Sequence, residues 1–135
     1  MPESIFNKRI LVLGDSHYCH EGCLDCGNLH EHSDCSGFTS KVVRYYLEAQ
    51  ESEGWMKTYS TFINTVFRRC TSDVDRKAFF ESVAFYNYFQ KAAGTDSESA
   101  PAYAAEYNQE KHLLAFYEVL EDLKPEVVIS WGDRV

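Results

Sequence analysis

The fold is decided by residues 10–18, which read ILVLGDSHY. The first four residues are apolar and partly β-branched, a pattern typical of a strand that is buried on both faces of a parallel sheet. Gly14 ends this run, and the polar residues Asp15, Ser16 and His17 follow directly. Open α/β sheets bind ligands outside the carboxyl ends of their strands. We therefore expect Gly14 and the residues after it to border a functional site.

The rest of the chain carries helical and strand patterns in turn. Helices are predicted over residues 39–50, 60–70 and 101–123. A further short helix is predicted after the capping-box pattern that begins at Ser72. Two further interior strands are predicted at residues 82–89 and 127–131. This order predicts an α/β protein, in which a central and mostly parallel sheet lies between helices in a three-layer α/β/α arrangement. The length suits one domain spanning residues 1–135.

The end of the chain does not complete this pattern. The last predicted strand closes at Gly132, and only three residues follow it. A parallel strand usually leads into a loop and a covering helix. We therefore expect the domain to be truncated after Val135, with the alternative that the last strand lies at an edge of the sheet.

The composition is that of a folded protein of the cytoplasm. Hydrophobic residues make up 44% and aromatic residues 15%, which supplies a core and excludes a disordered chain. No apolar run reaches the roughly 18 residues needed to cross a bilayer, so no membrane partner is expected. Thirteen basic and 21 acidic residues give a net charge of -8, which does not favour electrostatic binding to nucleic acid.

Residues 15–38 form a predicted loop that is rich in cysteine and histidine. Four of the five histidines lie there, and so do four of the five cysteines, namely Cys19, Cys23, Cys26 and Cys35. Several thiolates at short spacings are typical of zinc sites, so we predict that these four cysteines bind zinc. An iron–sulfur cluster would use the same thiolates, and free thiols or a disulfide are the metal-free alternatives.

The Gly-Asp-Ser run that ends at Ser16 resembles the first block of the SGNH/GDSL ester hydrolases. That resemblance implies that Ser16 is a nucleophile on the turn after the first strand. The family also uses a Gly-x-Asn-Asp motif and a late Asp-x-x-His motif. Here the third strand leads into Trp131-Gly132-Asp133-Arg134, without the asparagine, and no histidine follows.

A longer stretch resembles a different family. The relevant segments, in order, are the first strand with its Tyr-containing polar loop, GFTS from Gly37, FYNYF at residues 85–89, a long helix with Pro101 near its start, and KPEVVISWG at residues 124–132. This layout is similar to the uracil-DNA glycosylase superfamily over roughly residues 8–134. The family has a water-activating acid in its first loop, a base-reading asparagine at a strand end, and a later strand that closes in glycine.

The resemblance implies a role for each matching residue. Tyr18 corresponds to the aromatic side chain that stacks on the base, and Gly14 is a substrate-binding residue of the same first loop. Asn87 corresponds to the asparagine that reads the base. The position of the catalytic acid falls on Ser16, so Asp15 or His17 is expected to orient water. The closing histidine motif of the family is absent from this sequence. The resemblance therefore implies hydrolysis at a nucleobase, or recognition of a base, nucleotide or nucleic acid without turnover.

A third hypothesis involves no catalysis. The zinc loop at residues 15–38 could serve as a surface for binding a partner. Substitution of Cys23 by serine would then abolish activity in cells, whereas Asp15→Asn and Asn87→Ala would leave it unchanged. Labelling of Ser16 by a fluorophosphonate would instead indicate the ester hydrolase.

Overall fold

A computed structural model of the protein describes residues 4–16, 38–89 and 109–132. Three strands form one parallel sheet, β1 (Ile10–Gly14), β2 (Val83–Asn87) and β3 (Val127–Trp131), in the order β2-β1-β3. At the centre of the sheet Val12 pairs with Phe85 on one side and with Ile129 on the other. The predictions of an α/β protein and of a parallel sheet are thus confirmed.

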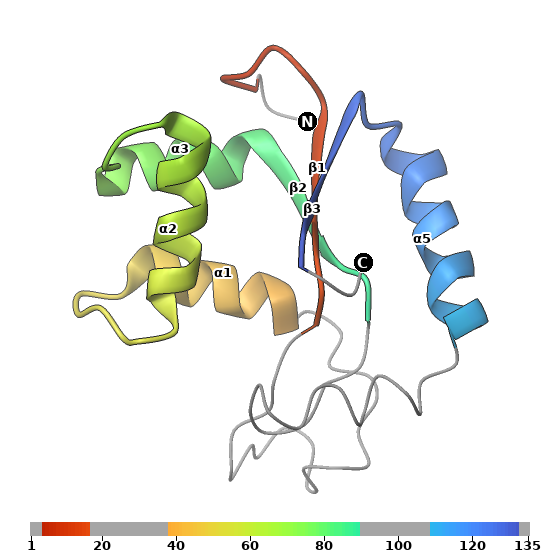
Figure 1. The fold of residues 1–135 in the computed structure, drawn as a ribbon, viewed down its shortest axis with the longest axis horizontal. Coiled ribbons are helices and arrows are strands. Elements are labelled where there is room, and N and C mark those ends of the chain that lie inside the picture. Colours follow the sequence, from red (N-terminus) through yellow and green to blue (C-terminus); the bar gives the residue numbers. More distant parts are fainter. Residues whose placement is uncertain (1–3, 17–37, 90–108, 133–135) are drawn as a thin grey trace, which may run out of the picture.

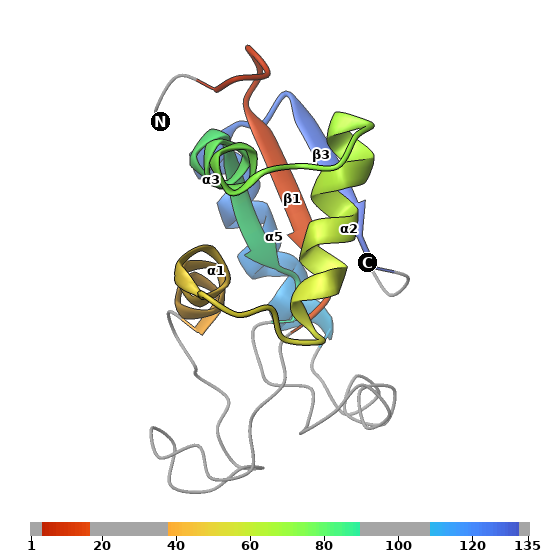
Figure 2. The same ribbon diagram turned by 90° about the vertical axis from the view of Figure 1, so that its left-hand side faces the viewer.

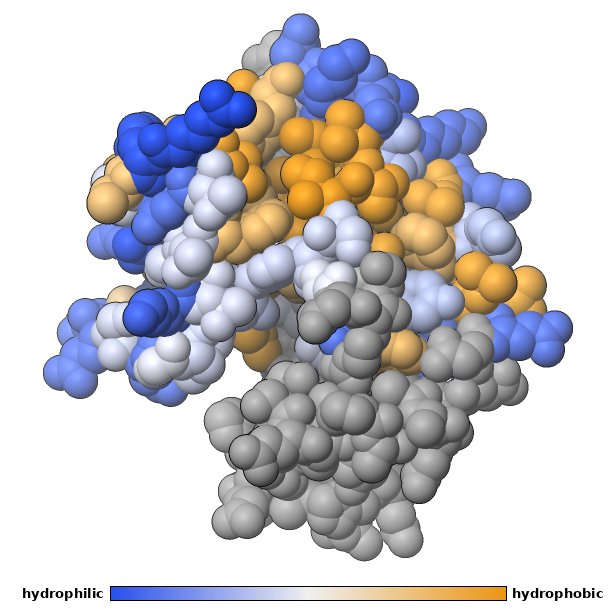
Figure 3. All heavy atoms as spheres, in the orientation of Figure 1, coloured by the Kyte–Doolittle hydropathy of each residue, from blue (hydrophilic) through white to orange (hydrophobic). Residues whose placement is uncertain are grey.

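The central strand β1 is buried on both faces, as its sequence predicts. Leu11 and Val12 point to opposite faces of the sheet and are both 0% exposed. The outer strand β3 differs from its prediction as an interior strand, because Val127 and Val128 are 40% and 44% exposed. Figure 3 shows apolar residues gathered over this strand. An apolar run indicates a strand, but it does not say whether another strand lies beside it.

In the described part of the chain, four helices connect the strands. They are α1 (Phe38–Glu48), α2 (Met56–Phe67), α3 (Asp73–Ser82) and α5 (Gln109–Leu123). In Figure 1, α1, α2 and α3 lie on one side of the sheet and α5 on the other. Figure 2 shows α1 near the carboxyl ends of the strands and α3 near their amino ends. Of the described helices, none has both the length and the apolar character needed to cross a membrane.

The main core lies between the sheet and helices α1 to α3. Its most buried members are Val12, Ile63 and Phe79, which are at most 1% exposed. Aromatic rings surround them, and Trp131 of β3 stacks on Phe62 of α2 with 4.4 Å between ring centroids. Burying each such side chain contributes about 1.5–3 kcal/mol, so these contacts hold the helices against the sheet.

Helix α3 begins with the capping box that the sequence predicts. The Ser72 hydroxyl accepts a hydrogen bond from the backbone N–H of Asp75, and the Asp75 carboxylate accepts one from the backbone N–H of Ser72. Arg69 binds the same carboxylate with two guanidinium nitrogens, at 2.6 and 2.8 Å. These hydrogen bonds, that of Arg69 first, hold the pKa of Asp75 well below its usual range.

Candidate functional site

The carboxyl ends of the three strands meet at one edge of the sheet. Gly14 pairs in register with Asn87 of β2 and with Trp131 of β3. Asp15 and Ser16 follow β1 directly and are half-buried. The structure therefore brings together four of the predicted site residues, Gly14, Asp15, Ser16 and Asn87. This carboxyl edge, defined by the last residues of β1, β2 and β3, is the candidate site.

Asn87 is held at this edge by a residue far away in the sequence. Its side chain is buried, with 7% of the residue exposed, and its Nδ2 atom donates a hydrogen bond to the Thr39 hydroxyl over 3.0 Å. Thr39 lies in the first turn of α1, since the helix begins at Phe38. The helix predicted over residues 39–50 thus begins one residue earlier, at Phe38. Thr39 links the start of α1 to the end of β2.

Gly14 leaves the room that the Asn87 side chain occupies. A Cβ atom built on Gly14 would lie 2.4 Å from Oδ1 of Asn87 and 3.2 Å from Cζ of Phe85. No side chain fits at such distances without displacing the amide. A glycine at position 14 therefore allows the amide to lie directly against the backbone of the central strand.

The pairing between β1 and the chain after β2 continues beyond the strands. The backbone N–H of Tyr88 donates to the carbonyl oxygen of Gly14, and that of Phe89 donates to the carbonyl oxygen of Asp15, both over 2.9 Å. These bonds fix the direction in which the chain leaves β1. As a result, Asp15 lies beside the segment that follows Asn87, within the candidate site.

The remaining predicted site residues lie outside the described part of the chain. They are His17 and Tyr18 and the four cysteines Cys19, Cys23, Cys26 and Cys35. Within residues 4–16, 38–89 and 109–132, no group of three or more Cys, His, Asp or Glu side chains is placed to hold a metal ion. The fifth cysteine, Cys70, is exposed between α2 and α3. The zinc assignment thus stays a prediction from the sequence.

Two residues near the edge could not be assigned a role from the sequence. Thr39 is one, because its contact with Asn87 joins two segments that no local pattern connects. His112 of α5 is the other; it is 4% exposed, and its ring centroid lies 5.4 Å from that of Phe89. His112 is thus a buried core residue beside this edge.

The geometry offers a ligand an amide at the end of β2 and the polar residues that follow β1. An amide can donate and accept hydrogen bonds at the same time, which suits a planar heterocycle with both kinds of group. Comparisons with protein-family models, with curated proteins and with solved structures find no match to this chain. A function for this chain therefore has to be argued from its own residues.

Proposed function

We propose that the chain is an α/β/α domain of the uracil-DNA glycosylase type that recognises a nucleobase at the carboxyl edge of its sheet. The supporting observation is the placement of Asn87. Its amide lies against Gly14, is oriented by the Thr39 hydroxyl, and ends a strand at the edge where such sheets bind ligands.

Recognition of the base uses the two sides of the Asn87 amide. The carbonyl oxygen accepts from a ring N–H and the amide nitrogen donates to a ring carbonyl, while Tyr18 stacks on the face of the base. The contact between Asn87 and Thr39 limits rotation of the amide, so little side-chain entropy is lost on binding. The same site can bind a free base, a nucleotide or an unpaired base in a strand.

Hydrolysis is the reaction that this site could support. Asp15 or His17 orients a water molecule toward the sugar carbon, a C–O bond forms, and the C–N bond to the base breaks. The attacking water gives up one proton to Asp15 or His17, and the electron pair of the broken bond leaves with the base, which takes up a proton. Ser16 occupies the position at which the family has its catalytic acid. We therefore assign the orientation of water to Asp15 or His17, and we take recognition of the base to be the main function of the site.

The charge of the chain limits the choice of ligand. A net charge of -8 repels the phosphates of a long nucleic acid. A free base carries no charge, and a mononucleotide carries only one phosphate group. We therefore expect short ligands to bind better than duplex DNA.

Binding of uracil and deoxyuridine monophosphate, measured by isothermal titration calorimetry, tests the proposal. Asn87→Asp keeps the shape of the side chain but replaces the donor, and should weaken binding about tenfold or more. Asn64→Asp is the matched control, since Asn64 also makes side-chain hydrogen bonds but binds Thr71, between α2 and α3. Equal affinities of the two variants, or no binding by the unmodified protein, would rule the proposal out.

The same preparation distinguishes the other hypotheses. Release of uracil from a single-stranded oligonucleotide, abolished by Asp15→Asn or by replacement of His17, would show turnover. Labelling of Ser16 by a fluorophosphonate would identify an ester hydrolase instead. A protein that binds no base and loses its cellular activity only with Cys23→Ser would be a zinc-loop interaction module.

A further inference from the structure

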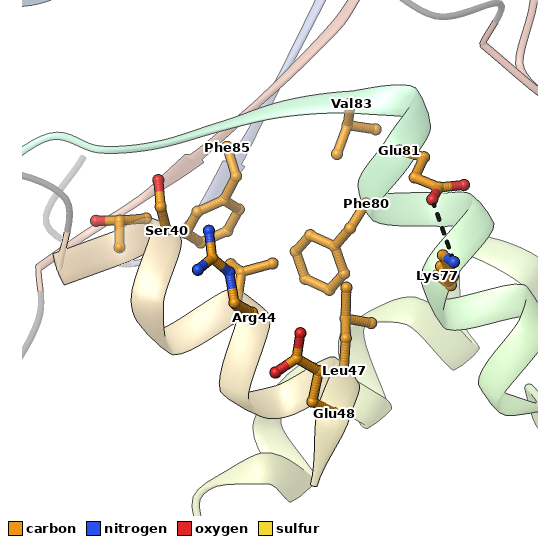
Figure 4. A pocket seen from close by; sticks show the side chains of 11 residues that line it. Ser40, Arg44, Leu47, Glu48, Lys77, Phe80, Glu81, Val83 and Phe85 are labelled. Carbon is orange, nitrogen blue, oxygen red and sulfur yellow. Dashed lines mark ion pairs between the residues drawn. The ribbon is translucent and has the colours of Figure 1, made fainter.

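A second hollow lies away from the carboxyl edge, between α1 and α3 and beside β2. It has a volume of about 510 Å³, within the range of small-ligand sites. Its floor is apolar and half-buried, and consists of Val43, Leu47, Phe80, Val83 and Phe85. Figure 4 shows the rings of Phe80 and Phe85 between the two helices, and their centroids are 6.2 Å apart. We call this hollow the α1–α3 groove.

Four charged residues surround this floor, and two of them neutralise each other's charge in an ion pair. Lys77 and Glu81, one turn apart on α3, form an ion pair of 3.8 Å. Arg44 and Glu48 are one turn apart on α1, and neither side chain has an ion-pair partner among the described residues. Figure 4 shows both of them beside the aromatic floor. The groove therefore presents one cation and one anion above an apolar surface.

This charge pattern restricts the class of ligand. An apolar anion could pair with Arg44 but would bring its charge close to Glu48, and an apolar cation would be repelled by Arg44. Arg44 and Glu48 are both exposed, so a neutral apolar ligand would pair neither charge and would gain only the apolar contacts. A zwitterion with an apolar side chain pairs both charges and covers the floor.

We propose that the α1–α3 groove binds a free α-amino acid with an aromatic or branched apolar side chain. The carboxylate of the ligand pairs with the Arg44 guanidinium, and its ammonium group pairs with the Glu48 carboxylate. The side chain packs on Phe80 and Leu47. Thr39 borders both this groove and the carboxyl edge, through its contact with Asn87, but the two sites otherwise use different residues.

Titration calorimetry with phenylalanine and leucine tests this proposal. Phenylalanine should bind, whereas N-acetylphenylalanine, phenylalaninamide and glycine should bind at least tenfold more weakly, because each lacks one of the three recognised groups. Equal binding of N-acetylphenylalanine would overturn the proposal in favour of a site for apolar anions. No heat with any of these ligands at millimolar concentration would overturn it altogether.

Variants locate the binding. Arg44→Gln and Glu48→Gln should each weaken phenylalanine binding at least tenfold. Arg68→Gln is the matched control, since Arg68 is exposed at the end of α2, away from the groove. Unchanged binding by Arg44→Gln would overturn the proposal. Uracil binding is measured on the same unmodified protein, so failure of nucleobase binding and failure of phenylalanine binding are separate results.

Discussion

Gly14 lies under the Asn87 amide, where an added Cβ would meet Oδ1 at 2.4 Å. We predict that Gly14→Ala lowers the free energy of unfolding by about 1–3 kcal/mol, because the amide and the Phe85 ring must both shift. Gly54→Ala is the control, since a Cβ there has no heavy atom within 4 Å. Urea unfolding measures both variants. Equal stability of the two would show that the close approach between Gly14 and Asn87 does not exist.

Tyr59 gives a prediction that depends on pH. Its ring packs among those of Tyr46, Trp55 and Trp131, and burial raises the pKa of its hydroxyl to about 12. The unfolded chain loses this proton near pH 10. The stability that the neutral hydroxyl allows is therefore complete below about pH 10 and is lost as the pH rises toward 12.

Tyr59→Phe removes this ionisation and keeps the ring. Between pH 10 and pH 12 the variant should lose about 2 kcal/mol less than the unmodified protein, as measured by urea unfolding at several pH values. Tyr117→Phe, at an exposed tyrosine of α5, is the control and should follow the unmodified protein. The same alkaline loss in Tyr59→Phe would mean that another group causes it.

Helix α3 depends on its first turn, where Ser72 and Asp75 bond reciprocally. Ser72→Ala should lower the free energy of unfolding by about 1 kcal/mol, since the N–H of Asp75 loses its acceptor. Ser52→Ala, in the exposed segment before α2, is the control and should change stability by less than about 0.5 kcal/mol. Guanidinium unfolding followed by circular dichroism measures both. A loss in Ser52→Ala as large as that in Ser72→Ala would contradict the role of the cap.

The sequence predicts those elements whose causes are local. The bounds of β3 match the prediction, and β1 differs from the apolar run at residues 10–13 only by including Gly14. Both strands are apolar runs followed by or ending in glycine, a pattern that is visible in the sequence. The start of α2 is missed by four residues: the helix begins at Met56, where the residue before it, Trp55, makes no side-chain cap. Glu53 binds both the Trp55 indole and the Tyr45 hydroxyl there, a contact that no local pattern reveals.

In the candidate site, too, only the features with local causes were predictable. Strand patterns and a resemblance single out Gly14 and Asn87, and the register of β1 with β2 places them side by side. Thr39 and the α1–α3 groove could not be predicted, because both arise from the packing of α1 against residues that lie about thirty or more positions further along the chain. Local periodicity carries no information about such contacts.

On the scale of the whole molecule, zinc in the loop at residues 15–38 is a separate prediction. The purified protein should contain about one zinc ion per chain by plasma mass spectrometry, and chelation should lower its melting temperature. Cys23→Ser should lose the metal, whereas the control Cys70→Ser, at the exposed cysteine, should retain it. Iron with visible absorbance would indicate the cluster instead. A metal-free protein with reactive thiols would refute both metals.

The central place of β1 has a consequence for the time course of folding. This strand is synthesised before β2 and β3, yet its partners are residues 83–87 and 127–131. Helices α2 and α3, which are joined by short-range bonds between Asn64 and Thr71, can form while β1 still has no neighbour. Because such distant pairing must overcome loop-closure entropy, we expect folding in milliseconds to seconds rather than microseconds. Strand β1 therefore has both of its described neighbours only after β3 is synthesised, and a nascent chain must keep residues 10–13 from aggregating until then.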